Sequence, residues 1–257
     1  MTATDPVLTV DSGSRRAELV RLFLQPIAAL LLVAAVLLWA FNTELDAIEV
    51  VTLNASTLLK ATWEHVLITI AVTVLVVVVA IPLGIVLTRP WAKAVVPVFL
   101  GIATIGQAAP AIGVIVLYFL FTEQEGLWAA AIPLAFVSLL PVLRNTMVGI
   151  QQVDPSLVDA GRGIGLSAFG VLRRVELPLA VPLILAGLRT SLVLAVGTAT
   201  LALFVNGGGL GFIIDTGYRV ARTTVLLTGA TLTVGLALLV DWLGALAERY
   251  LGPKGLR

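Results

Sequence analysis

The sequence predicts an all-α membrane protein with about six transmembrane helices, and its composition and hydropathy pattern both support this. Hydrophobic residues make up 59% of the 257 residues and charged residues only 12%, whereas a soluble domain is roughly half apolar and a quarter charged. The mean hydropathy is correspondingly high, at +1.08. The apolar residues also gather in runs of about 20 residues, the length that a helix needs to cross roughly 30 Å of hydrocarbon.

The apolar runs predict where the spans lie. In chain order they are Leu22–Phe41, Val66–Leu87, Ala94–Phe121, Leu127–Leu143, Leu179–Phe204 and Thr223–Leu246. The third run is interrupted by Pro97 and Pro110. Proline removes a backbone donor, and neighbouring groups must then satisfy the freed carbonyl, so we expect a kinked helix there.

The distribution of lysine and arginine predicts the orientation, because these residues are retained on the cytoplasmic side of a membrane. One set of loops contains Arg15, Arg16, Arg21, Arg89, Lys93, Arg144, Arg162, Arg173, Arg174, Arg249, Lys254 and Arg257. The opposite set contains only Lys60, Arg219 and Arg222. We therefore expect both termini, and the polar stretch between the fourth and fifth spans, on the cytoplasmic side of a cell membrane.

This orientation divides the chain into four parts. Residues 1–21 form a cytoplasmic N-terminal tail, and residues 22–63 contain the first transmembrane helix and an external loop. Residues 64–247 form the main transmembrane domain, in which residues 153–178 are a cytoplasmic hairpin. Residues 248–257 form a cytoplasmic C-terminal tail.

Several functional classes find no support in the composition. The chain has no cysteine, so thiol chemistry and thiolate metal sites are excluded. His65 is the one histidine, and we interpret it as an interfacial residue rather than a metal or catalytic ligand. The net charge of +1 argues against nucleic-acid binding. No nucleophile–base arrangement indicates an enzyme, and no metal site is expected.

The stretch between the fourth and fifth spans predicts two short helices joined by a glycine turn. Asp154 can cap free N–H groups, and Pro155 suits the first helical position. The cluster Gly163–Gly165 permits the positive φ that ends a helix, and Ser167 can cap a second helix. We expect this second helix to stop at Leu177-Pro178. The residues alone leave two interpretations open: a rigid docking protrusion or an ordinary amphipathic interfacial hairpin.

The same stretch resembles the cytoplasmic motif of ABC-importer permeases. That motif is Glu-Ala-Ala, then a glycine four residues after the last alanine, then an apolar-Leu-Pro triplet. Asp159-Ala160-Gly161, Gly165 and Leu177-Pro178 stand at these positions. Asp159 keeps the charge of the glutamate on a shorter side chain, and Gly161 weakens the helix by about 1 kcal/mol relative to alanine.

The resemblance implies a type I, binding-protein-dependent importer of a prokaryotic cell. Its first short helix would be the coupling helix, which docks onto a cytoplasmic ABC ATPase subunit through Asp159, Ala160, Gly161, Gly165, Leu177 and Pro178. The sequence contains no Gly-x-x-x-x-Gly-Lys-[Ser/Thr] phosphate loop. ATP-Mg would therefore be bound by the partner ATPase and no cofactor by this chain. The other implied partners are a second permease, identical or paralogous, an extracytoplasmic substrate-binding protein and the lipid bilayer.

Further stretches resemble the osmoprotectant branch of this family, whose permeases carry glycine betaine, carnitine or choline. They are Pro141–Thr146, His65–Thr73, Ile81–Ile85 and Gly207–Gly211. The stretch Ile105–Pro110 is less typical. The implied function is therefore import of a quaternary ammonium compound such as these or proline betaine.

Two alternatives remain open. One is an ABC permease for another small polar solute such as an amino acid. The other is a secondary transporter driven by an ion gradient, which predicts paired half-sequences or acidic residues at mid-membrane; the sequence shows no clear internal repeat and no buried carboxylate pair.

Polar or helix-breaking residues within the spans are candidates for the translocation path. They are Gln107, Pro110, Asn145, Arg189, Thr198 and Asn206. Each could equally be a helix–helix packing contact. An intramembrane charge such as Arg189 is a functional hypothesis in itself, and its predicted depth suggests Asp241 as a partner.

Overall fold

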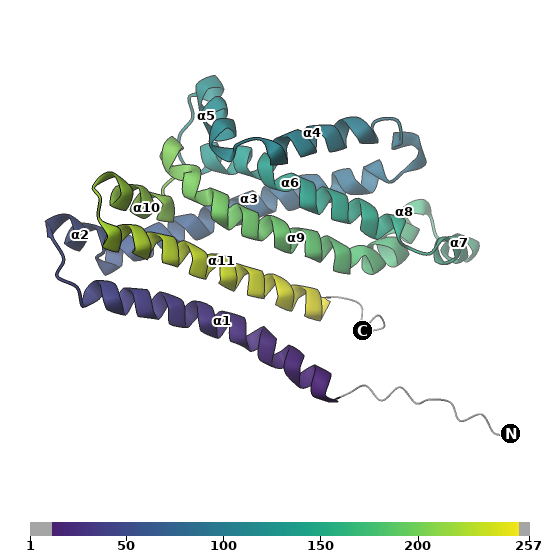
Figure 1. The fold of residues 1–257 in the computed structure, drawn as a ribbon. Coiled ribbons are helices and arrows are strands. Elements are labelled where there is room, and N and C mark those ends of the chain that lie inside the picture. Colours follow the sequence, from purple (N-terminus) through teal and green to yellow (C-terminus); the bar gives the residue numbers. More distant parts are fainter. Residues whose placement is uncertain (1–11, 252–257) are drawn as a thin grey trace.

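The computed structural model describes residues 12–251, and these residues form an all-helical bundle (Figure 1). The helices that are long and apolar enough to cross a membrane are α1 (Ser12–Phe41), α3 (Ala55–Leu87), α6 (Leu127–Gln151), α9 (Leu177–Ala199, extended at both ends) and α11 (Thr223–Leu251). The pair α4 (Val96–Ala108) and α5 (Ala111–Thr122) makes up to one more span. The prediction of an all-α membrane protein is confirmed, and the predicted number of about six spans compares with five candidate spans, or six if the bent pair α4–α5 is one span.

Shorter elements connect these helices. They are α2 (Ala47–Thr52), η1 (Pro90–Ala92), α7 (Pro155–Gly163), α8 (Ala168–Val171), the π-helical segment η2 (Leu172–Glu176), the 3₁₀ segment η3 (Thr200–Val205) and α10 (Leu210–Arg219). No strand occurs between residues 12 and 251.

Two helices begin well before the apolar runs that predict them. Helix α1 begins at Ser12 rather than Leu22, and residues 1–11 of the predicted tail lie outside the described residues. Helix α3 begins at Ala55 rather than Val66, because the side chain of Asn54 accepts a hydrogen bond from the backbone N–H of Thr57 at 2.9 Å. Hydropathy detects the part of a helix that meets lipid, whereas the cap fixes where the helix starts.

The kink predicted in the third apolar run is a break of 104° between α4 and α5. Ala109 there has extended backbone angles, as the residue before a proline prefers, and Pro110 precedes the first residue of α5. Figure 1 shows α5 standing across the direction of α4.

The helix stop predicted at Leu177-Pro178 is wrong, because the backbone continues from α8 through η2 into α9. The π turn of η2 ends directly before Leu177, so Pro178 falls in the first turn of α9. The Leu177 N–H donates to the carbonyl of Leu172, five residues back, and this wider π register accommodates the proline that follows it. The segment therefore joins the hairpin of α7 and α8 to a membrane helix by continuous helical backbone.

Helix α6 occupies the centre of the bundle and packs against α3, α4 and α9 (Figure 1). Small residues bring these helices close together. A Cβ atom on Gly187 of α9 would lie 2.7 Å from the carbonyl oxygen of Pro141, and one on Gly84 of α3 would lie 2.8 Å from Thr146. Such contacts are typical of helix packing in membranes, where no hydrophobic driving force holds helices together.

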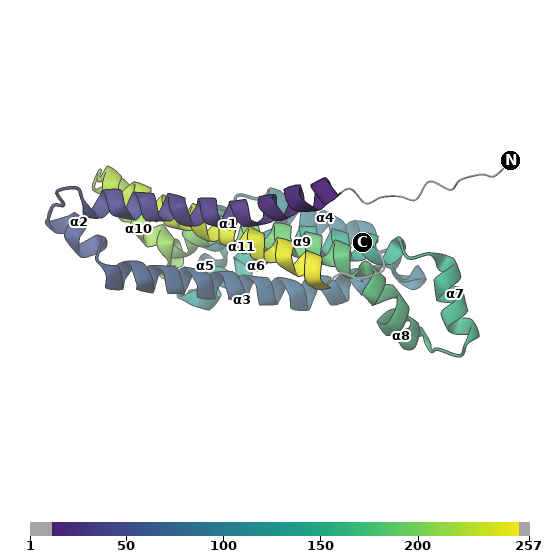
Figure 2. The ribbon, with the colours of Figure 1, turned by 90° about the horizontal axis from the view of Figure 1, so that it is seen from below.

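Helix α1 packs on the outside of the bundle against α11, as both views show (Figures 1 and 2). The α7–α8 hairpin projects from one end of the bundle (Figure 2). The N-terminal end of α1 and the C-terminal end of α11 lie towards that same end, while α2 and α10 lie at the opposite end (Figure 1).

Candidate functional site

The hairpin that follows α6 is built by the caps that the sequence predicts. The Asp154 carboxylate accepts a hydrogen bond from the Ser156 backbone N–H at 2.8 Å, and the Ser167 hydroxyl accepts one from Gly170 at 3.1 Å. The bond from Ser156 also lowers the pKa of Asp154 below its ordinary value. Gly165 has a φ of +88°, which the turn between the two helices requires.

The motif residues divide between an exposed face and a packed face of α7. Asp159 and Ala160 are exposed, and the Asp159 carboxylate lies 3.9 Å from Arg162. Gly161 is buried, and a Cβ atom there would lie 3.4 Å from Val171 and 3.6 Å from Val175. Gly161 is therefore the position where α7 packs on the segment that leads into α9, while the exposed face is free for a partner.

The close of the motif lies at the start of α9. Leu177 is half-buried and packs beside a small apolar cluster, and Pro178 is exposed. The six motif residues thus lie on one continuous stretch that runs from α7 through the glycine turn to the first turn of α9.

The candidate path residues lie in several parts of the bundle rather than in one site. Gln107 and Pro110 are exposed at the α4–α5 break. Asn145 lies at the α6–α9 interface beneath Gly187, which fits a packing contact.

The other two polar candidates lie near or beyond the end of α9. The Thr198 hydroxyl donates to the carbonyl of Leu194 in its own helix at 2.8 Å. Asn206 is exposed, and its side chain donates to Glu125 at 3.3 Å.

His65 is fully buried, so its interpretation as an interfacial residue is wrong. Its Nε2 lies 2.9 Å from the carbonyl oxygen of Val196, and its Nδ1 lies 3.3 Å from the backbone nitrogen of Leu210. Since the Leu210 N–H donates to Nδ1, Nε2 carries the proton and donates to Val196. The ring thereby connects α3 to α9 and to the first residue of α10.

The glycine-rich loop before α10 is also held by Glu64, the residue that precedes His65. The Glu64 carboxylate accepts a hydrogen bond from the backbone N–H of Gly209 at 3.0 Å. Gly208 and Gly209 have φ values of +78° and +90°, which side-chain-bearing residues rarely adopt. A cavity of about 460 Å³ lies beside this loop, with Lys60, Glu64 and Asn206 among its lining residues. The sequence could not reveal it, because its walls come from segments about 145 residues apart.

Arg189 and Asp241 form the ion pair that their predicted depth suggests. Arg189 Nη2 donates to Asp241 Oδ2 at 2.7 Å, and Glu248 lies 3.5 Å from the same guanidinium. Asp241 also accepts a hydrogen bond from Gln25 of α1 at 2.8 Å. This cluster joins α1, α9 and α11 through the partners of Arg189.

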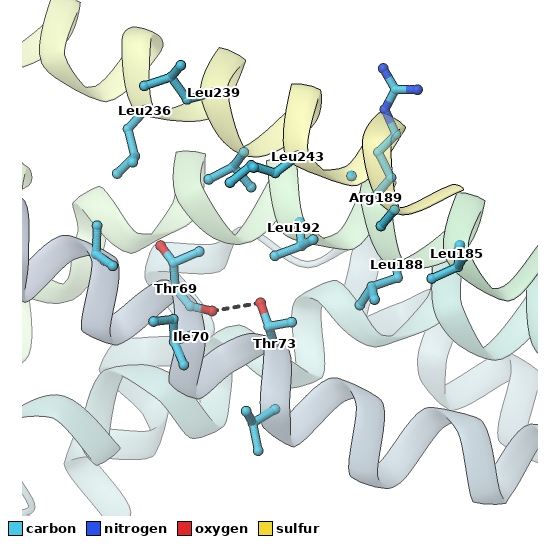
Figure 3. A pocket seen from close by; sticks show the side chains of 15 residues that line it. Thr69, Ile70, Thr73, Leu185, Leu188, Arg189, Leu192, Leu236, Leu239 and Leu243 are labelled. Atoms are coloured by element: carbon cyan, nitrogen blue, oxygen red, sulfur yellow. Dashed lines mark hydrogen bonds between the residues drawn. The ribbon is translucent and has the colours of Figure 1, made fainter. Parts of the chain in front are cut away.

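An apolar cavity of about 550 Å³ lies next to Arg189, between α3, α9 and α11. Figure 3 shows leucine side chains of α9 and α11 facing α3 across it, with Thr69 and Thr73 on the α3 side. The guanidinium of Arg189 points away from the cavity (Figure 3). Between residues 12 and 251, no group of three or more histidine, aspartate or glutamate residues could hold a metal ion.

Comparison with known proteins connects these features to a family. Residues 80–252 match the family model described as binding-protein-dependent transport system inner membrane component. The choline transport system permease protein OpuBB of Bacillus subtilis is 41% identical over 204 residues, which cover 79% of this chain and 93% of that protein. The osmoprotectant import permease protein OsmW of Salmonella typhimurium is 33% identical over 218 residues, covering 83% of this chain and all of that protein.

A solved structure shares the fold. The inward-facing MetNI methionine ABC transporter contains a chain that is 26% identical, with a TM-score of 0.67, over 76% of this chain and 96% of that one. The family match covers more than half of the chain and includes the hairpin and the spans around it. The chain therefore belongs to the inner membrane components of binding-protein-dependent transport systems, and it is a multi-pass membrane transport subunit rather than an enzyme.

Proposed function

We propose that this chain is the permease subunit of an ABC importer that moves a quaternary ammonium osmoprotectant, such as choline, glycine betaine or carnitine, into the cell. The observation that carries the proposal is the identity of 33–41% to permeases named for choline, carnitine and osmoprotectant transport, over most of each chain. The exposed hairpin with its family motif supports the ABC mechanism.

The hairpin is the part of the chain that would receive energy from ATP hydrolysis. Asp159 and Ala160 present the exposed face of α7 to a cytoplasmic ATPase subunit, which binds ATP-Mg. Gly161 and Gly165 allow the close packing and the turn that hold α7 in place, and Leu177 and Pro178 begin the membrane helix that follows. Movement of α7 would thus reach α9 through a helical backbone without a break.

The charges and the fold both support the proposed orientation. The hairpin end of the bundle carries Arg162, Arg173 and Arg174, and the ends of α1 and α11 lie towards it (Figure 1). Positive residues favour the cytoplasmic side. This supports a cytoplasmic location for both terminal segments, 1–21 and 248–257, and for residues 153–178.

The translocation path would form between two permease subunits, identical or paralogous. Among the path candidates, Gln107, Pro110 and Asn206 are exposed on the single chain, as a surface at such an interface requires. An extracytoplasmic binding protein would deliver the substrate to the opposite end, where α2, α10 and the glycine-rich loop lie (Figure 1).

The coupling role is tested by uptake in proteoliposomes that contain the permease, its ATPase and its binding protein. Asp159→Lys and Gly165→Val should abolish ATP-dependent uptake while the protein remains in the membrane. Glu123→Lys makes the same charge change as Asp159→Lys at an exposed position that follows α5, outside the hairpin, and serves as the control. Full uptake by both hairpin variants would refute the coupling assignment.

The substrate class is tested in the same proteoliposomes with labelled choline, glycine betaine, carnitine and methionine. We expect saturable uptake of at least one quaternary ammonium compound, dependent on ATP and on the binding protein. Uptake of methionine alone would favour the amino-acid alternative. Uptake that follows an ion gradient without ATP would indicate a secondary transporter.

A further inference from the structure

Arg89 and Glu176 form a bidentate ion pair at the hairpin end of the bundle. Arg89 Nη1 donates to Glu176 Oε1 at 3.1 Å, and Nη2 donates to Oε2 at 2.5 Å. Arg89 follows the last residues of α3, and Glu176 is the last residue of η2, 87 residues further along the chain. Two parallel N–H···O bonds fix the relative orientation of the two groups as well as their distance.

The same guanidinium also holds the end of its own helix. Arg89 Nε donates to the carbonyl oxygen of Ile85 at 3.3 Å, and this carbonyl belongs to the last turn of α3. A cation near the carbonyl end of a helix is favoured by the helix dipole. One side chain therefore binds the end of α3 and the carboxylate of Glu176 at once.

Little water reaches the two side chains of this pair, so the ion pair does not exchange readily with water. The side chain of Glu176 is 9% exposed and that of Arg89 is 27% exposed. Because water has so little access to this carboxylate, breaking the pair leaves a buried charge without compensation. An ion pair on an open surface would exchange readily with water.

Glu176 stands directly between the hairpin and the membrane helices. Helix α7 packs through Gly161 against Val171 and Val175, and Val175 precedes Glu176. On the other side, Leu177 and Ile85 of α3 both pack against the small apolar cluster of Ile150, Ala180 and Ile184. Contacts therefore run without a gap from α7 through η2 to the end of α3, and π-helical segments such as η2 are frequent at functional sites.

We propose that Arg89 and Glu176 are positioning residues that make α3 move together with the coupling hairpin when the ATPase acts. The proposal rests on the proposed docking of the hairpin to an ATPase and names the residues that carry its movement to α3. The backbone already carries the movement to α9, because η2 continues into that helix. The ion pair adds α3, which no backbone segment joins directly to the hairpin.

The first test measures substrate imported per ATP hydrolysed in proteoliposomes with all subunits present. Glu176→Gln and Arg89→Met should each keep at least half of the ATPase activity but lower uptake per ATP about tenfold. The double variant should be no worse than either single variant, because both changes remove the same interaction. Arg89→Lys keeps the charge but not the fork geometry and should recover part of the lost coupling.

A matched control is the ion pair between Arg189 of α9 and Glu248 of α11, which lies 3.5 Å apart and involves no residue of the hairpin. Glu248→Gln removes a carboxylate from an Arg–carboxylate pair as Glu176→Gln does, and should leave uptake per ATP unchanged because Arg189 keeps its bond to Asp241. Native uptake per ATP in both Glu176→Gln and Arg89→Met would overturn the proposal. A purely structural role predicts instead that ATPase activity and uptake fall in parallel, which would also overturn it.

The second test does not depend on transport. The native chain contains no cysteine, so spin labels can be placed at Trp91→Cys and Phe169→Cys, both of which are exposed. In the assembled complex, with and without ATP, the distance between these labels should keep one narrow distribution, because η1 and α8 move together. Glu176→Gln should broaden it.

The two tests separate the inference from the proposed function. Absence of ATP-driven osmoprotectant uptake by the native complex would refute the function while leaving the label distances as the test of the pair. An equally narrow distribution in Glu176→Gln would overturn the pair's role even where native uptake is normal. If Glu176→Gln does not assemble, Arg89→Lys is labelled instead, and a native distribution in it together with native uptake per ATP would overturn the proposal.

Discussion

Arg189 of α9 donates hydrogen bonds through two nitrogens to the carboxylate of Asp241 of α11. The two partners are not equally replaceable. The guanidinium has a second carboxylate 3.5 Å away in Glu248, whereas the further hydrogen bond that Asp241 accepts comes from the uncharged amide of Gln25. Replacing Asp241 therefore leaves Arg189 with a second carboxylate, whereas replacing Arg189 leaves Asp241 with an uncharged partner.

We predict that Arg189→Met destabilises the protein more than Asp241→Asn does. Met takes from the Asp241 carboxylate the guanidinium that binds it through two nitrogens, at a cost of about 3 kcal/mol, whereas Asn leaves Arg189 paired with Glu248, at a cost of about 1 kcal/mol. Thermal unfolding of the detergent-solubilised protein measures the difference. Asp215→Asn, at an exposed pair, should change the melting temperature little. A larger loss in Asp241→Asn than in Arg189→Met would contradict this account.

Gly187 and Gly197 lie on the same helix, but replacing each with alanine should have different effects on the stability of the protein. A Cβ atom on Gly187 would lie 2.7 Å from the Pro141 carbonyl oxygen and 2.8 Å from Asn145, so Gly187→Ala should cost about 1–3 kcal/mol through overpacking. A Cβ atom on Gly197 meets nothing within 4 Å. Gly197→Ala should therefore be neutral or stabilise the helix by up to about 1 kcal/mol. Equal melting temperatures for the two variants would show that α6 and α9 are not packed as described.

The turn between α7 and α8 gives a second matched pair of glycines. Gly165 has a φ of +88°, and a side chain there costs about 1–2 kcal/mol even though no atom lies in its way. Gly163 also has open space around it but no positive φ. We predict that Gly165→Ala lowers ATP-dependent uptake several-fold while Gly163→Ala leaves it near native. Uptake assays in proteoliposomes decide this, and an equal effect of both substitutions would mean that flexibility, not the left-handed conformation, matters at this turn.

The sequence predicts what depends on local chemistry. The caps of Asp154 and Ser167, the turn at Gly165 and the break at Pro110 all follow from single residues and their backbone preferences, and all are confirmed. The apolar runs likewise predict the spans, because a membrane requires a fixed length of apolar helix.

The features that the sequence did not predict depend on tertiary contacts. His65 looked interfacial because it is polar and precedes an apolar run, yet its two partners, Val196 and Leu210, come from segments more than 130 residues away. The pair of Arg89 and Glu176 is hidden for the same reason. The continuous helix through Leu177-Pro178 depends on the π turn of η2, which the conformational preferences of its residues do not predict. The pairing of Arg189 with Asp241 could be predicted only because the depth of each residue in the membrane can be counted along its helix.

The last prediction concerns acid and Asp46, which caps α2 outside the spans. Its pKa is lowered first by the hydrogen bond from the backbone N–H of Glu49 and next by the guanidinium of Arg222. Because the folded state holds this carboxylate in its charged form, the unfolded state binds more protons as the pH falls. The stabilisation is therefore complete above the ordinary value of 3.8 and is lost as the pH drops through the lowered pKa.

Asp46→Asn should accordingly lower the melting temperature at pH 7, and the difference from the native protein should shrink between about pH 5 and pH 3. Glu44→Gln, at an exposed carboxylate two residues earlier, controls for the loss of one negative charge. Melting curves across this pH range measure the effect. A difference that stays constant down to pH 3 would mean that the bonds of Asp46 to Glu49 and Arg222 do not contribute to stability. Protonating the native carboxyl would then leave the melting temperature of the native protein unchanged relative to that of the Asn variant.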